Sequence, residues 1–295
     1  MNQMTPSLPT CGLLNIDKPS GMSSRAVVNR MERAAGKIKV GHAGTLDPLA
    51  SGVLVLCVGP ATRLIDYVQR MPKAYRATFL LGQSSPSDDV ESECVSIVAA
   101  PRPTREEIEQ ATKPFLGDIE QRPPAFSAIK IKGQRAYKLA RRGDEVEMPL
   151  RRVRIDAFDV VEYEYPKLVV DIACGSGTYV RSLGRDLAVS LGSGAVMSEL
   201  VRTAIGSFTV EAASNLEEVW PESFPKHLLP PLQALESLPQ LRLDDLQIEE
   251  VRHGRLVDCN LAVDEVAAVD SEGRLIAIMI PRDTGKFGPK HNFIR

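Results

Sequence analysis

Apolar positions along the chain recur with two spacings, which predict a fold that mixes helices and strands. Apolar residues three or four positions apart predict helices in the segments 23–36, 61–71, 101–116 and 178–192. Alternating or continuous apolar runs predict strands within 11–21, 50–59, 73–82, 153–165, 167–177 and 194–210. These segments show no fixed repeat period, so we do not expect a repeat protein.

Two of these segments favour an α+β fold with a largely antiparallel sheet. The runs 153–165 and 167–177 are separated only by a turn at Pro166, which is typical of a β-hairpin. The run 50–59 is apolar almost throughout, so this strand should be covered on both faces. Helix starts are also visible, with Thr104 and Thr178 as predicted N-caps.

Proline marks a change in organisation near residue 220. Prolines gather between Pro221 and Pro239, which predicts a linker over residues 221–240. The segment 241–295 contains short β-like runs, such as LAVDEVAAVD and RLIAIMIP, and predicts a small β-rich domain. We therefore expect a larger domain over 11–220, a linker over 221–240 and a small domain over 241–295.

Composition narrows the class of protein. The hydrophobic fraction of 43% and charged fraction of 25% are those of a globular protein. Five cysteines without C-x-x-C spacing argue against a disulfide framework or a zinc site. The first ten residues lack the features of a signal peptide, and no apolar run reaches the roughly 20 residues of a membrane span. We expect a cytoplasmic protein with no membrane association.

The segment VGHAGTLDPLASGVLVLCVG, residues 40–59, holds the first candidate for chemistry. Asp47 stands before Pro48, which is common at a turn or helix start. Gly44 and Gly52 flank it, and glycines let the backbone approach a ligand closely. His42 lies on the same loop. The residues alone therefore leave two interpretations of Asp47 open, a structural turn residue and a catalytic carboxylate.

Two further candidates carry similar alternatives. Tyr75, near the start of a predicted strand, is either a core aromatic or a platform on which a nucleobase stacks. Arg181, one turn into a predicted helix, is either a surface residue or a partner for a buried carboxylate. The four histidines lack metal-ligand spacing, and no nucleotide-binding motif is present, so we expect neither metal nor cofactor.

A basic run in the middle of the chain is the last candidate. Its interpretations are a solvated helix face and an RNA-binding surface, the second favoured by interleaved Phe126 and Tyr137. A net charge of −2 gives no global signal for nucleic acid, because the C-terminal segment is acidic. The basic residues are Lys130, Lys132, Arg135, Lys138, Arg141, Arg142, Arg151, Arg152 and Arg154.

In their order, these segments resemble the bacterial tRNA pseudouridine-55 synthase family of the TruB type. The resemblance covers most of residues 11–208, and its G-H-x-G-T-L-D-P-x-A-x-G core is highly specific. The matching segments are GLLNIDKPSGMSS, KVGHAGTLDPLASGVLVLCVGPATRL, KAYRATFLLG, GDIEQRPPAFSAIKIKGQRAYKLARRG, CGSGTYVRSLGRDL and ELVRTAIGSF.

This resemblance implies an α+β pseudouridine synthase domain with a curved, mainly antiparallel sheet flanked by helices, and a PUA-like C-terminal domain. The implied reaction isomerises the T-loop uridine 55 of tRNA after the base is flipped out, without cofactor or metal. The implied partner is the T-arm stem-loop of tRNA, bound by a thumb-like insertion over residues 117–147. The implied enzyme is a monomer that works without guide RNA.

The resemblance also assigns roles to single residues. Asp47 matches the catalytic aspartate, acting as a nucleophile or a base. Arg181 matches its ion-pair partner, and Tyr75 matches the aromatic that stacks on the uracil. The remaining matches are Tyr179 and Leu200 as pocket walls, His42 as support for the flipped-out RNA loop, and Lys130, Lys132, Arg135, Lys138, Arg141 and Arg142 as RNA contacts.

Two features depart from the family pattern, and two other functions stay open. The loop 83–96 lacks the usual Thr-Asp-Thr-x-Asp sequence, and the C-terminal segment is short for a PUA-like domain. One alternative function is an RNA-folding module without catalysis, and the other is a guide-dependent synthase. The intact set of Asp47, Tyr75 and Arg181 argues against the first alternative, and the thumb-like insertion argues against the second.

Overall fold

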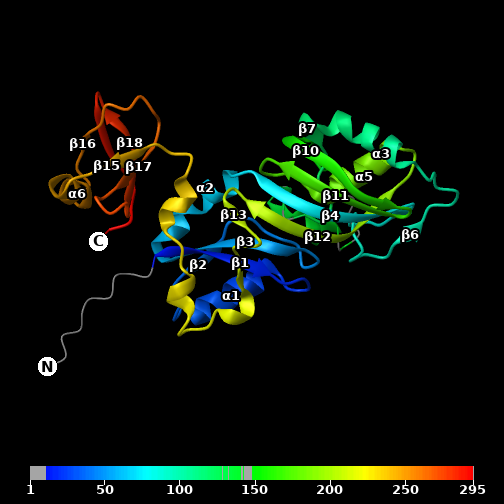
Figure 1. The fold of residues 1–295 in the computed structure, drawn as a ribbon, viewed down its shortest axis with the longest axis horizontal. Helices are drawn as coiled ribbons and strands as arrows, with labels where there is room; N and C mark the ends of the chain where they lie inside the picture. Colours follow the sequence, from blue (N-terminus) through cyan, green and yellow to red (C-terminus); the bar gives the residue numbers. More distant parts are fainter. Residues whose placement is uncertain (1–10, 128, 132, 141, 143–147, 295) are drawn as a thin grey trace.

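A computed structural model of the 295-residue chain describes residues 11–127, 129–131, 133–140, 142 and 148–294 (Figure 1). A ten-stranded sheet forms the larger part, in the order β14-β1-β3-β12-β4-β11-β10-β7, with β2 paired to β3 and β13 to β12. Its strands are β1 (Gly12–Lys18), β2 (Val40–His42), β3 (Ser51–Val58), β4 (Lys73–Leu81), β7 (Gly117–Gln121), β10 (Arg151–Glu164), β11 (Lys167–Cys174), β12 (Ala195–Ile205), β13 (Phe208–Thr209) and β14 (Ser214–Asn215).

Most neighbouring strands in this sheet are antiparallel, which confirms the predicted class. Strands β10 and β11 form the expected hairpin around Pro166. The parallel pairs are β1 with β14 and β12 with β3. In β3 every residue after Ser51 is buried, as its continuous apolar run predicted.

Helices pack on the sheet and complete its hydrophobic cores. Helix α1 (Ser24–Ala34) packs on β1 and β3, while α3 (Arg105–Thr112) and α5 (Val180–Ser190) pack over β4, β10, β11 and β12. The predicted helix at 61–71 is a 3₁₀ turn followed by the short α2 (Ile65–Arg70). Thr104 caps α3 in a reciprocal capping box with Glu107, as predicted.

The predicted cap of α5 is wrong. Tyr179, and not Thr178, stands at the N-cap, and no side chain caps this helix. The hydroxyl of Thr178 instead donates a hydrogen bond to the carbonyl of Gly175, 3.1 Å away. Threonine bonds its own turn as readily as a helix terminus, so its presence one residue early was misleading.

A second sheet of five strands, in the order β15-β17-β18-β19-β16, forms the C-terminal part (Figure 1). Its elements are β15 (Gln240–Arg242), α6 (Asp245–Arg252), β16 (Val257–Asp258), β17 (Val266–Val269), β18 (Leu275–Asp283) and β19 (Lys286–Asn292). The two apolar runs noted in the sequence become β17 and β18. The proline-rich segment before this sheet forms short 3₁₀ helices that bury Phe224 and Leu235.

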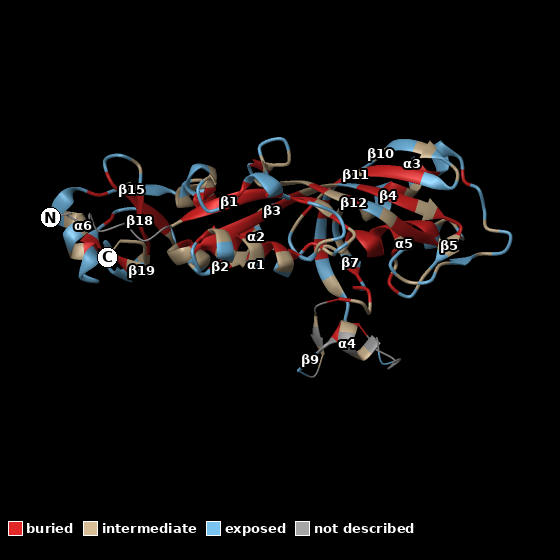
Figure 2. Cartoon of the chain, turned by 90° about the horizontal axis from the view of Figure 1, so that it is seen from below, coloured by how far each residue is buried: buried red, intermediate tan, exposed pale blue. Residues whose placement is uncertain are grey.

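The basic insertion stands away from the main body. It contains β8 (Lys130–Ile131), β9 (Gln134–Arg135) and α4 (Ala136–Ala140), and Figure 2 shows β9 and α4 projecting beside β7. Strands β5 (Gln83–Ser84) and β6 (Val95–Ser96) form a separate two-stranded ribbon. None of the helices in the described part of the chain has the length and apolar character needed to span a membrane.

Candidate active site

Asp47 lies on the loop between β2 and β3, and local contacts fix the backbone around it. The neighbouring Leu46 is held at both backbone groups by the hydroxyl of Ser24 on α1, at 2.8 and 2.9 Å. The carbonyl of Asp47 accepts a hydrogen bond from the amide of Ala50 at 3.1 Å, which forms a turn. The turn interpretation is therefore correct as local structure, and this turn uses the backbone carbonyl of Asp47 rather than its carboxylate.

Arg181 holds that carboxylate from the first turn of α5. Its guanidinium lies 3.0 Å from Asp47 and 3.1 Å from Asp89, and it donates to the carbonyls of Ser87 and Phe126 at 2.8 and 3.0 Å. The Arg181 side chain is 6% exposed, whereas that of Asp47 is 38% exposed. The surface interpretation of Arg181 is wrong, and the pairing with a carboxylate is confirmed as geometry.

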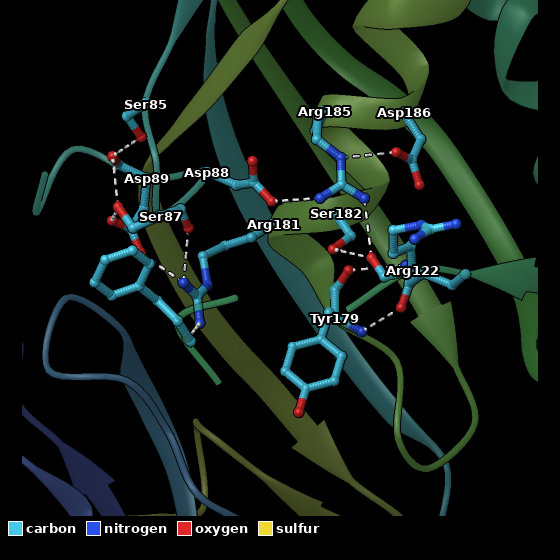
Figure 3. A network of polar contacts seen from close by, with 12 residues as sticks. Ser85, Ser87, Asp88, Asp89, Arg122, Tyr179, Arg181, Ser182, Arg185 and Asp186 are labelled. Carbon is cyan, nitrogen blue, oxygen red and sulfur yellow. Dashed lines mark hydrogen bonds and ion pairs between the residues drawn. The ribbon is translucent and has the colours of Figure 1, made fainter. Parts of the chain in front are cut away.

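The divergent loop 83–96 supplies a carboxylate that sequence reasoning missed. Asp89 is buried, and it accepts hydrogen bonds from the Ser87 hydroxyl at 2.5 Å and from the Glu91 amide at 3.1 Å (Figure 3). Nothing in SDD at residues 87–89 distinguishes a buried aspartate from an exposed one. Only the packing of this loop on α5 brings Asp89 to Arg181.

A second arginine on α5 extends this charged network. Arg185 lies 2.7 Å from Asp88 and 2.9 Å from Asp186, and it donates to the carbonyl of Arg122 at 2.9 Å (Figure 3). Burial raises the pKa of the Asp88 carboxyl, against the opposing effect of Arg185. The network therefore fastens loop 83–96 and the segment after β7 to the same helix.

Tyr75 and Leu200 belong to the hydrophobic core that also contains Leu46, next to Asp47, and Tyr179 directly precedes the helix that carries Arg181. Tyr75 on β4 is half-buried and packs against the core that contains Leu200 of β12, and burial raises the pKa of its phenol. Tyr179 stands directly before α5, where its amide donates to Gln121 at 2.8 Å. The structure thus brings these residues to one region, while their contacts with a substrate remain predictions.

His42 ends β2 and faces a cationic environment. Its Nδ1 is buried and has no hydrogen-bond partner among the described residues. Burial lowers the pKa of His42, and the positive charges of Arg202 and Arg25 lower it further. The imidazole is therefore expected to be neutral at neutral pH, and its predicted contact with RNA is not tested by this geometry.

Two buried lysines were also missed. Lys18 is fully buried and donates to the carbonyls of Pro19 and Met22 at 2.9 and 2.6 Å. Burial lowers its pKa to about 8, partly opposed by the negative charge of Asp47. Burial likewise lowers the pKa of Lys73 to about 8. Lysines are rarely buried, so the chain pattern gave no reason to place these two inside.

Only some of the residues predicted to contact RNA from the insertion lie in the part of the chain that the structure describes. Lys130 lies in β8, Arg135 in β9, Lys138 in α4, and Arg142 is exposed just after that helix. Lys132 and Arg141 lie outside the described residues. Among the described residues, no group of three or more His, Cys, Asp or Glu side chains could hold a metal ion.

Comparison with known proteins identifies the family. The model for the "TruB family pseudouridylate synthase (N terminal domain)" matches residues 32–180. The chain is 44% identical to tRNA pseudouridine synthase B of Rhodopirellula baltica, over 82% of this chain and 74% of that protein. It is 40% identical to tRNA pseudouridine synthase B of Ruegeria pomeroyi, over 96% of both.

Solved structures agree with the fold. A chain in "Crystal Structure of a Cbf5-Nop10-Gar1 Complex" superposes with a TM-score of 0.74 at 28% identity, covering 96% of this chain and 85% of that one. A chain in "Structure of H/ACA RNP bound to a substrate RNA containing 2'-deoxyuridine" gives the same TM-score at 25% identity. This chain therefore belongs to the TruB family of pseudouridylate synthases, whose reaction is an isomerisation of uridine.

Proposed function

We propose that this protein converts uridine 55 in the T loop of tRNA to pseudouridine, with Asp47 as the catalytic carboxylate. The relatives at 40–44% identity are named tRNA pseudouridine synthase B, which supports tRNA as the substrate. The observation that carries the proposal is the Asp47–Arg181 ion pair of 3.0 Å. It joins a partly solvent-exposed carboxylate to a cation that the core encloses.

The chemistry needs a carboxylate of fixed orientation beside a flipped-out base. Extruding a nucleotide costs a few kcal/mol, and stacking on an aromatic ring returns about 1–3 kcal/mol. Tyr75 would provide that ring, with Leu200 and Tyr179 as walls. Arg181 would keep Asp47 in one orientation while it attacks as a nucleophile or removes a proton, which is the positioning that effective catalysis requires.

The basic insertion suits a tRNA clamp. Residues 117–147 carry many of the cations of the central basic run, and phosphate contacts supply most of the affinity for RNA. We assign residues 11–220 to the catalytic domain, 221–240 to a linker and 241–295 to a PUA-like domain. The T-arm stem-loop would bind between the insertion and the Asp47 loop, with His42 supporting the displaced RNA. The enzyme would act as a monomer without guide RNA.

Site-specific mapping of pseudouridine tests the proposal. Purified protein is incubated with unmodified tRNA in the presence of a chelator and without other RNA. We expect pseudouridine at position 55 alone, no product with Asp47→Asn, and an RNA affinity of that variant within about threefold of wild type. Asp171→Asn, at an exposed carboxylate, is the matched control and should retain activity.

Three outcomes would contradict parts of the proposal. Pseudouridine at another position would refute the T-loop assignment, and turnover by Asp47→Asn would refute the catalytic role. A requirement for added guide RNA would favour the guide-dependent alternative.

A further inference from the structure

Four residues that lie far apart in the sequence form one row across the sheet. Lys18 of β1 pairs with Gly52 of β3, Gly52 with Arg202 of β12, and Arg202 with Tyr75 of β4. Directly paired residues on neighbouring strands project to the same face of a sheet. The row therefore places the two cations and the tyrosine on one side of the sheet, next to the Asp47 loop.

Arg202 connects this row to the loop that carries Asp47. Its Nε donates to the carbonyl of Val53 at 2.8 Å, and its Nη2 donates to the carbonyl of Gly44 at 3.1 Å. Burial raises the pKa of the Tyr75 hydroxyl, and the positive charge of Arg202 opposes that rise. One guanidinium thus bonds the loop before Asp47 and the strand after it, and Arg202 pairs across the sheet with Tyr75, the aromatic residue assigned to the base.

Two glycines make this close approach possible. A Cβ at Gly52 would lie 2.3 Å from the backbone oxygen of Arg202, which no side chain tolerates. Gly52 has φ of +93° and Gly44 has φ of +118°, which glycine adopts readily. Only glycine at position 52 lets β3 lie this close to Arg202, and at position 44 the positive φ rather than lack of space favours glycine.

Burying the Arg202 side chain in a core costs free energy. It is 2% exposed, and no carboxylate of the described residues lies within ion-pair distance of it. A buried cation without a counter-charge costs several kcal/mol unless hydrogen bonds offset the cost. An apolar residue would fill the same position in a stable core more cheaply. Stability of the sheet alone therefore does not account for an arginine here.

We propose that Arg202 is a positioning residue for pseudouridine formation, fixing the Tyr75 ring relative to the Gly44–Asp47 loop. This inference rests on the proposed function and adds a residue to it. The planar guanidinium donates in several fixed directions, whereas a lysine ammonium is a compact charge that does not reproduce that geometry. Loss of this link would let the stacked base and the Asp47 carboxylate move relative to one another.

Single-turnover kinetics on a T-arm stem-loop, with enzyme in saturating excess, test this link. Displacement of reacting groups by about 1 Å costs about 100-fold in rate, so we expect a loss of that size for Arg202→Met. Arg202→Lys keeps the buried charge but loses the planar, forked guanidinium. We expect its single-turnover rate to fall by at least about tenfold. RNA affinity of both variants should stay within about threefold of wild type.

Coupling to Tyr75 separates positioning from a merely structural role. Tyr75→Phe keeps the stacking ring of the residue that pairs with Arg202 and removes the hydroxyl on which the Arg202 charge acts, so it should also slow the single-turnover step. The double variant Arg202→Met/Tyr75→Phe should be no more than about threefold slower than Arg202→Met, because both changes break one link. If the two losses in single-turnover rate multiply in the double variant, the proposal is overturned. A wild-type rate in Tyr75→Phe would overturn it as well.

The controls distinguish this inference from the proposed function. Arg76→Met removes an exposed arginine of β4 that pairs with Asp171, and it should turn over at the wild-type rate. If wild type and Arg76→Met form no pseudouridine, the proposed function fails. If they are active and Arg202→Lys, checked for folding by thermal unfolding, is equally fast, only the positioning role fails. Should Arg202→Met not fold, Arg202→Lys and Tyr75→Phe decide the question.

Discussion

The buried cations on the two sides of Asp47 are stabilised in different ways. On the α5 side, Arg181 lies between two carboxylates, Asp47 and Asp89, at 3.0 and 3.1 Å. On the sheet side, Lys18 and Arg202 are buried cations whose described hydrogen-bond acceptors are mainly backbone carbonyls. One side is held by paired charges and the other by the positions of strands and loops.

This difference determines what each side is sensitive to. Removing one member of a buried ion pair leaves the other charge without compensation. Cations bound by carbonyls instead depend on backbone atoms staying in place, so a shift of one strand weakens several bonds together. The α5 side should therefore respond most to changes of charge, and the sheet side to changes of backbone geometry.

Arg181→Met should produce the largest effect of the substitutions that compare the two sides. It leaves the buried Asp89 unpaired, which should lower the free energy of unfolding by about 3–5 kcal/mol. Pseudouridine formation should also be lost, because Asp47 loses its anchor. Chemical denaturation and single-turnover assays measure the two effects.

The double variant Arg181→Met/Asp89→Asn separates stability from activity. Neutralising Asp89 removes the buried charge, so much of the stability should return while activity stays lost. RNA affinity should change little in either variant. A collapse of RNA affinity in Arg181→Met would instead indicate a phosphate contact.

Gly52→Ala should show the sensitivity of the sheet side to the backbone. The new methyl would meet the Arg202 backbone oxygen at 2.3 Å, and φ of +93° disfavours alanine. Gly21→Ala is the matched control, because Gly21 has φ of +81° but nothing within 4 Å of its Cβ position. We expect Gly52→Ala to unfold more easily by about 1–3 kcal/mol beyond the loss in Gly21→Ala. Equal losses in thermal unfolding would refute the steric account.

Lys18 gives the smallest predicted effect, which appears as pH dependence. Burial lowers its pKa in the folded protein to about 8 from an ordinary 10.5, so the folded state binds fewer protons between these values. Wild type should therefore gain stability relative to Lys18→Met as the pH rises from about 8 to about 10.5. Allowing for solvent screening, we expect a gain of about 1–2 kcal/mol. A pH-independent difference in denaturant unfolding would contradict this.

Local features of the site were predictable because local chemistry causes them. The turn at Asp47 and the capping box at Thr104 arise from residues within a few positions of each other. The failure at Thr178 shows the limit of this reasoning, since the N-cap of the helix is Tyr179, one residue later, and the Thr178 hydroxyl donates to the preceding turn. The resemblance to the family motifs then predicted that Asp47, Tyr75 and Arg181 belong to one site.

The sequence by itself determined the main strand and helix segments of the larger domain, the antiparallel hairpin and the family, but not elements such as β7 and α6. The tertiary structure alone decided which charges are buried and which meet. Asp89 reaches Arg181 because a loop packs on α5, and Lys18, Gly52, Arg202 and Tyr75 meet because strand pairing aligns them. Periodicity reports which face of an element is apolar, but the register between distant strands depends on the whole sheet. For that reason the cationic side of the site could not be read from the chain.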